Sequence, residues 1–107
     1  ENNLGLAQKR LQQALSNDPT HGEALLSLAA LLWQQTRNES ALIYYVRAQA
    51  LSGYKERALL GQAQVAIDKK KYLQALHLLR QVIQFNPSRS DVIANIQSLE
   101  NLVRNQT

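Results

Sequence analysis

A period of 34 residues is the feature of this sequence that most constrains its fold. Five sets of similar residues recur at this interval: Pro19, Gly53 and Pro87; Ala7, Ala41 and Ala75; Leu11, Tyr45 and Leu79; Ala14, Ala48 and Val82; Leu25, Leu59 and Ile93. Self-similarity at a fixed period of this size is typical of repeat architectures, in which each unit buries its apolar face against its neighbours. Because five registers agree on one period, the chain is predicted to fold as a stack of similar units.

Within each unit the apolar spacing is helical. In the segment from Gly22 to Thr36, the apolar residues lie three and four positions apart, on one helix face: Leu25, Leu28, Ala29 and Leu32. The segment from Glu39 to Ser52 shows the same spacing, and the third unit repeats both patterns. Breaks fall at 17–19, 36–38, 52–53, 68–70 and 86–87. The pattern therefore predicts pairs of helices of about 14 residues, joined by short turns into hairpins.

Composition narrows the class of protein. The 107 residues suit one domain, and 45% hydrophobic residues exclude a disordered linker. The absence of cysteine excludes a disulfide scaffold, a thiolate metal site and a cysteine nucleophile. No apolar run approaches the roughly 18 residues of a membrane span. The start at Glu1 and the lack of methionine indicate either a processed protein or an excised piece of a longer one. The compartment stays open between the cytoplasm and a bacterial periplasm or envelope.

The sequence resembles the tetratricopeptide repeat family, whose 34-residue unit has small residues where its two helices cross. The small positions are Ala29 and Ala63, Ala41 and Ala75, and Ala14 and Ala48. Leu28 matches the family's leucine and Tyr45 its large residue. The sequence departs from the family pattern at other positions. Leu25 and Leu59 replace the usual tryptophan, and Gln62 replaces the leucine in the last full unit. Gly53 replaces a proline, and Val82 replaces an alanine.

The resemblance implies an all-α, right-handed solenoid of antiparallel helix hairpins with about six helices. Residues 1–21 would hold the second helix of a partial repeat, 22–55 and 56–89 two full repeats, and 90–107 a capping helix. That last segment carries one apolar stripe, made of Val92, Ile96, Leu99 and Val103, beside polar residues, as a terminal unit requires.

Nothing in the sequence points to catalysis. His21 and His77 lie in different units; His77 has no acidic residue or second histidine at helical metal-site spacing, and His21 lies in a turn between helices. There is no glycine-rich phosphate loop and no nucleophile elbow. We therefore expect no enzyme activity, no metal and no cofactor.

The resemblance implies a partner-binding groove along the first helix of each unit. Its exposed positions would be Glu23, Leu26, Ala30, Trp33 and Gln34, followed by Arg57, Leu60, Gln64, Ile67 and Asp68. Leu26, Trp33, Leu60 and Ile67 would form an apolar row suited to an extended peptide or an amphipathic helix. Trp33 is either the anchor of this groove or a cover for the neighbouring hairpin. Arg57 and Gln64 could orient a carboxylate or a peptide backbone.

The leading hypothesis is a non-catalytic scaffold that docks a peptide or helix of a protein partner within a larger assembly. Chaperone-docking members of the family hold a carboxylate with lysine and asparagine; Leu26 and Ala30 stand at those places, so that clamp is not expected. The short, alanine-rich and glutamine-rich sequence is similar to those of bacterial members of the family that serve pilus, secretion, cytochrome or envelope biogenesis.

Two other hypotheses follow from exposed and basic residues. A self-associating segment of a longer solenoid would form a homo-oligomer through exposed terminal helices, such as the helix with Leu4, Leu11 and Leu15. The net charge of +4 is compatible with nucleic acid, but the bases are scattered apart from Lys69, Lys70 and Lys71, so this partner is disfavoured. The lysine run is either a solvated turn or a docking point for an acidic partner.

Overall fold

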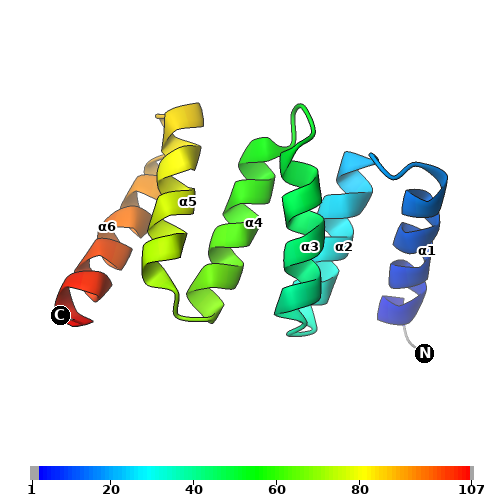
Figure 1. The fold of residues 1–107 in the computed structure, drawn as a ribbon, viewed down its shortest axis with the longest axis horizontal. Coiled ribbons are helices and arrows are strands. Elements are labelled where there is room, and N and C mark those ends of the chain that lie inside the picture. Colours follow the sequence, from blue (N-terminus) through cyan, green and yellow to red (C-terminus); the bar gives the residue numbers. More distant parts are fainter. Residues whose placement is uncertain (1–2, 107) are drawn as a thin grey trace.

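The computed structural model describes residues 3–106, which form a row of helices that run alternately up and down (Figure 1). The helices are α1 (Asn3–Asn17), α2 (Gly22–Gln34), α3 (Asn38–Gln49), α4 (Lys55–Asp68), α5 (Tyr72–Phe85) and α6 (Ser90–Gln106). No strand occurs in this range. The molecule measures 45 × 29 × 18 Å along its principal axes. The predicted all-α architecture of about six helices is confirmed.

Each helix packs on the helix before it and the helix after it in the chain, and α2 and α4 also contact each other. The elongated shape follows, because every unit buries its apolar surface on its neighbours and not in one central core. The predicted segment from Glu39 to Ser52 ends earlier in the structure. Its helix stops at Gln49, because Leu51 already donates its N–H to Ala48 in a turn before Gly53.

The turns inside the two complete hairpins, α2–α3 and α4–α5, have the same geometry. Thr36 and Lys70, 34 residues apart, both have left-handed backbone, with φ of 59° and 60°. In the first turn Thr36 and Arg37 donate their N–H groups to Trp33 and Leu32, each over 2.9 Å, and the second turn repeats this pattern. These bonds are those of a Schellman motif, and they offset the cost of left-handed backbone, about 1–2 kcal/mol, at a non-glycine residue.

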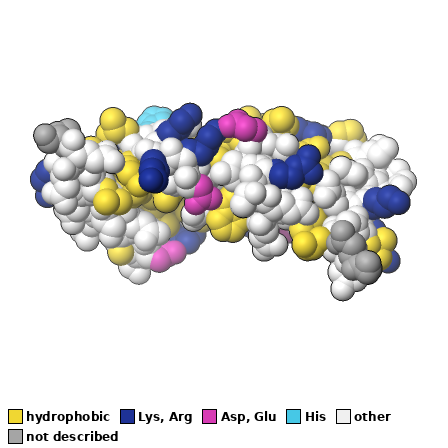
Figure 2. Space-filling view, turned by 90° about the horizontal axis from the view of Figure 1, so that it is seen from below, with side chains coloured by type: hydrophobic (Ala, Val, Ile, Leu, Met, Phe, Trp, Pro, Cys, Tyr) yellow, Lys and Arg dark blue, Asp and Glu magenta, His cyan; other side chains and the backbone are white. Residues whose placement is uncertain are grey.

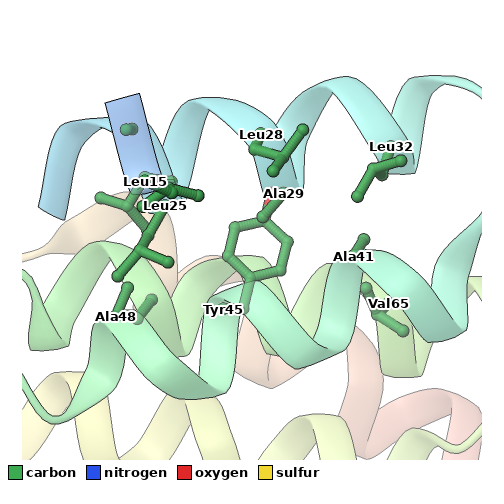
Figure 3. Packing of buried hydrophobic residues seen from close by; sticks show 12 residues of the cluster. Leu15, Leu25, Leu28, Ala29, Leu32, Ala41, Tyr45, Ala48 and Val65 are labelled. Atoms are coloured by element: carbon green, nitrogen blue, oxygen red, sulfur yellow. The ribbon is translucent and has the colours of Figure 1, made fainter. Parts of the chain in front are cut away.

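Alanines at the helix crossings allow close approach of the paired helices. The crossing residues Ala29, Ala41 and Ala48 have no exposed surface. In Figure 3 the ring of Tyr45 points from α3 towards Ala29 on α2. The core falls into two clusters: one unites buried residues of α1, α2 and α3, and the other those of α5 and α6, with α4 contributing to both.

The stripe predicted for the last helix faces inwards. Val92 and Leu99 are buried, and Ile96 and Val103 are partly buried against the second cluster. Gln97, on another side of α6, is exposed. Between residues 3 and 106, no helix has both the length and the apolar character needed to cross a bilayer.

Candidate protein-binding face

The ten residues predicted to line a groove all lie on α2 and α4, which are direct neighbours. Five come from α2 and five from α4. Residues at the same place in consecutive units are 34 positions apart, so the contact between these helices brings equivalent residues together. We call the surface made by these ten positions the α2/α4 face.

An ion pair between Glu23 and Arg57 lies at one end of the α2/α4 face. Arg57 donates from Nη1 to Glu23 Oε2 over 2.7 Å and from Nη2 to Oε1 over 3.2 Å. The hydrogen bond from Arg57 lowers the pKa of the Glu23 carboxyl, and the same bond raises the pKa of Arg57. Sequence reasoning suggested Arg57 for holding a partner's carboxylate. The structure shows its guanidinium engaged in a fork with Glu23, although both side chains stay about half exposed, at 55%.

The other end is organised around Asp68. The indole Nε1 of Trp33 donates to Asp68 Oδ2, and Gln64 Nε2 donates to Asp68 Oδ1 over 3.3 Å. Trp33 is half-buried, and its ring packs against the first core cluster. Trp33 therefore packs on the core and also links α2 to α4 through its indole N–H, while part of its side chain stays accessible.

The apolar row is shorter than the sequence suggested. Leu26 is only 5% exposed and belongs to the first core cluster, so the expectation of an exposed Leu26 is wrong. Its counterpart in the next unit, Leu60, is half-buried, as is Ile67. The two positions differ in burial although α2 and α4 each contact three other described helices. Of the remaining positions, Ala30 is half-buried and Gln34 is exposed.

The lysine run of the α4–α5 turn is not one basic patch. Lys69 points to Glu39 on α3 and forms an ion pair with its Oε2, while Lys70 and Lys71 are exposed. Figure 2, which views the molecule from the side of the α2–α3 and α4–α5 turns, shows Lys and Arg side chains spread along the surface with acidic ones among them. A nucleic-acid partner needs many phosphate contacts on one surface, and this face does not gather them.

The titratable groups do not assemble into a reactive cluster. His21 accepts the N–H of Ala24 at its Nδ1 over 3.1 Å and so caps the start of α2. His77 is exposed on α5. In the part of the chain that the structure describes, no group of three or more His, Asp or Glu could hold a metal ion.

Sequence reasoning missed an apolar strip on the outer side of α3. Ile43 and Val46 are 59% and 51% exposed. The signal was present in the repeat itself, because the same register holds Lys9 and Gln12 in α1. A comparison of exposed positions between units, in addition to the search for shared buried ones, would have found it.

No family model matches the sequence, and no curated protein is significantly similar to it.

Proposed function

We propose that this chain is a non-catalytic interaction scaffold of the tetratricopeptide type, which binds a short peptide or helix of a partner protein on the α2/α4 face. In this proposal, the scaffold works within a larger protein assembly. The observation that supports it most is the half-buried apolar row of Trp33, Leu60 and Ile67, which runs between the Glu23–Arg57 pair and Asp68. An apolar strip with polar groups at both ends suits a peptide segment, because apolar side chains give affinity while the polar ends fix its direction.

Two polar groups are available to a bound backbone. Gln34 and Gln64 are exposed, and each amide carries both donors and an acceptor. Gln64 already contacts Asp68, so a peptide N–H could replace that weak 3.3 Å contact without leaving a buried group unsatisfied.

End-to-end self-association through the terminal helices is less favoured. Leu4 and Leu6 on α1, and Ile93 and Leu102 on α6, are exposed. However, Gln97 stands in the register of the crossing residues Ala29 and Ala63, so the outward side of α6 carries a long polar side chain where a closely packed hairpin needs a small one.

The single tryptophan provides the test of the proposed binding face. Peptides selected from a random display library on the isolated chain would be titrated while the emission of Trp33 is recorded. We expect saturable changes in emission, and we expect Leu60→Ala and Ile67→Ala to weaken binding about tenfold each, about 1.4 kcal/mol. Leu73→Ala is the matched control, because Leu73 is 70% exposed on α5, away from the face.

Circular dichroism of each variant establishes that its helices are intact. Equal affinity of a selected peptide for the wild type and for both variants would show that the α2/α4 face is not where the peptide binds.

A further inference from the structure

The outer face of α3 is apolar in its middle and charged at its ends. Ile43 and Val46 lie exposed at the centre, with Leu42 half-buried beside them. Together with Glu39 and Arg47 they line a shallow hollow of about 460 Å³. We call these five residues the α3 patch. It lies away from α2 and α4, because α3 packs against those helices with its other sides.

The fold itself does not require apolar residues at this place. In α5 the positions of Ile43 and Val46 are held by His77 and Arg80, and in α1 by Lys9 and Gln12. All three helices occupy the second position of a unit, yet only α3 exposes two large apolar side chains here. A departure from the repeat pattern that leaves apolar surface in water is typical of an association site.

The charges of the patch are arranged so that it complements itself. Glu39 lies in the first turn of α3 and Arg47 in its last turn. The two residues are eight positions apart, which corresponds to about 12 Å along a helix. When two copies of α3 lie antiparallel about Ile43, the acidic end of each faces the basic end of the other. A parallel arrangement would instead place like charges together.

Both end groups keep capacity for such a contact. Glu39 is paired with Lys69, yet its side chain is 76% exposed. Arg47 is held in place, since its Nη2 donates to the carbonyl of Pro19 over 3.1 Å and its guanidinium lies 5.4 Å from the ring centre of Tyr44. Arg47 is exposed, and its guanidinium carries further N–H donors besides the one bound to Pro19.

We propose that a second copy of this chain packs on the α3 patch, with the two α3 helices antiparallel across a two-fold axis. Each Ile43 and Val46 then packs on its counterparts, and each Glu39 faces the Arg47 of the other copy. This is an isologous contact, in which the same patch serves both sides. One helix face is smaller than the roughly 800 Å² that each partner buries in a standard interface, so the dimer is weak, with a micromolar to millimolar dissociation constant.

The inference does not depend on the proposed function, but it adds to it. The α2/α4 face lies on other helices and stays open in the dimer. A dimer therefore presents two such faces, and a partner with two binding segments would gain affinity through avidity.

Sedimentation equilibrium over a wide concentration range tests the dimer. The wild type is expected to shift from monomer to dimer as concentration rises. The double variant Ile43→Lys with Val46→Gln, which inserts the residues that α1 carries in the same register, is expected to stay monomeric. The matched control, Leu73→Lys with Leu102→Gln, removes exposed apolar side chains from α5 and α6 and should dimerise like the wild type. A wild type that is monomeric throughout, or a double variant that dimerises as it does, would overturn the proposal.

Exchanging the charges at the ends of the patch distinguishes an antiparallel dimer from non-specific association of apolar surfaces. Glu39→Arg makes both ends of the patch basic, and Arg47→Glu makes both acidic, so each variant alone is expected to dimerise at least several-fold more weakly. Mixed together, the two variants place opposite charges at both ends and should form a heterodimer. The absence of heterodimer in the mixture, at concentrations where the wild type dimerises and both variants are folded, would exclude the antiparallel contact.

Discussion

At the scale of single residues, Tyr45 and Gly61 show how one unit adapts to its neighbour. A side chain on Gly61 would overlap the ring of Tyr45, which lies directly against this position of α4. In the other units the register of Tyr45 holds a leucine, and the register of Gly61 holds Ser27 or Asn95. The large ring therefore fills the space that a side chain takes in the neighbouring units. Gly22 and Tyr54 form a second contact of the same kind.

The first prediction concerns Gly61→Ala. Helix propensity alone favours alanine by about 1 kcal/mol, but the overlap with the ring of Tyr45 costs about 1–3 kcal/mol in a packed site. We therefore expect a net loss of up to about 2 kcal/mol in the free energy of unfolding, measured by urea denaturation.

The control for Gly61→Ala is the same change in a Tyr45→Leu background, where the ring is gone. There the substitution should be neutral or stabilising, which a double-mutant cycle reveals as coupling between the two sites. A loss of equal size in both backgrounds would show that the ring is not the cause.

At the scale of the element, α6 shows what a terminal helix contributes. One side, with Val92 and Leu99, is buried against the second core cluster, while Leu102 is 45% exposed on the same helix. Because α6 contacts only α5 among the described helices, its docking rests on this one stripe. The spacing of the stripe was readable in the sequence.

A matched pair of substitutions in α6 measures the docking energy. Leu99→Ala deletes a buried side chain and should lower the free energy of unfolding by about 2–4 kcal/mol. Leu102→Ala makes the same chemical change at an exposed position and should alter it by no more than about 0.5 kcal/mol. Chemical denaturation of both variants gives the comparison, and equal effects would mean that α6 is not docked through the stripe.

At the scale of the whole molecule, ion pairs connect consecutive units. Arg57 binds Glu23 one unit earlier, and Arg89 binds Glu56 over 2.7 Å. Arg89 also binds Asp91 over 2.7 Å at the start of α6. The hydrogen bond from Arg89 lowers the pKa of Asp91 to about 2, and those from Arg57 and Lys69 lower the pKa of Glu23 and Glu39.

These shifts predict the direction of acid sensitivity. A carboxyl whose pKa is lower in the folded than in the unfolded chain stabilises the fold above its unfolded pKa, here 3.8 for Asp91 and 4.5 for Glu23 and Glu39. That contribution is lost as the pH falls towards the folded pKa. The thermal midpoint should therefore be steady above about pH 5 and should fall between about pH 4.5 and 2.

Arg57→Gln provides the control for the pH series, because it removes the partner of Glu23 and should make the acid-induced decrease smaller. Melting followed by circular dichroism at each pH gives the data. A midpoint that stays constant or rises as the pH falls to about 2 contradicts the expectation.

The sequence by itself determined the helices, their pairing into hairpins and the inward stripe of α6. These features follow from local patterns: apolar residues every three or four positions choose one side of a helix, and small residues such as Ala29 and Ala41 mark where two helices can approach. Because each unit contacts its neighbours in the chain in the same way, the pattern of buried positions in one unit predicts that of the next.

Only the tertiary structure decided which positions at the edges of the buried helix faces stay exposed. Leu26 and Leu60 hold the same register, yet Leu26 is buried in the first core cluster, while Leu60 is only half-buried against the second. The pairing of Trp33 with Asp68, and the exposure of Ile43 on α3, depend on which helix lies beside the residue. Periodicity determines the side of a helix that is buried, but the position of more distant helices determines how far that burial extends.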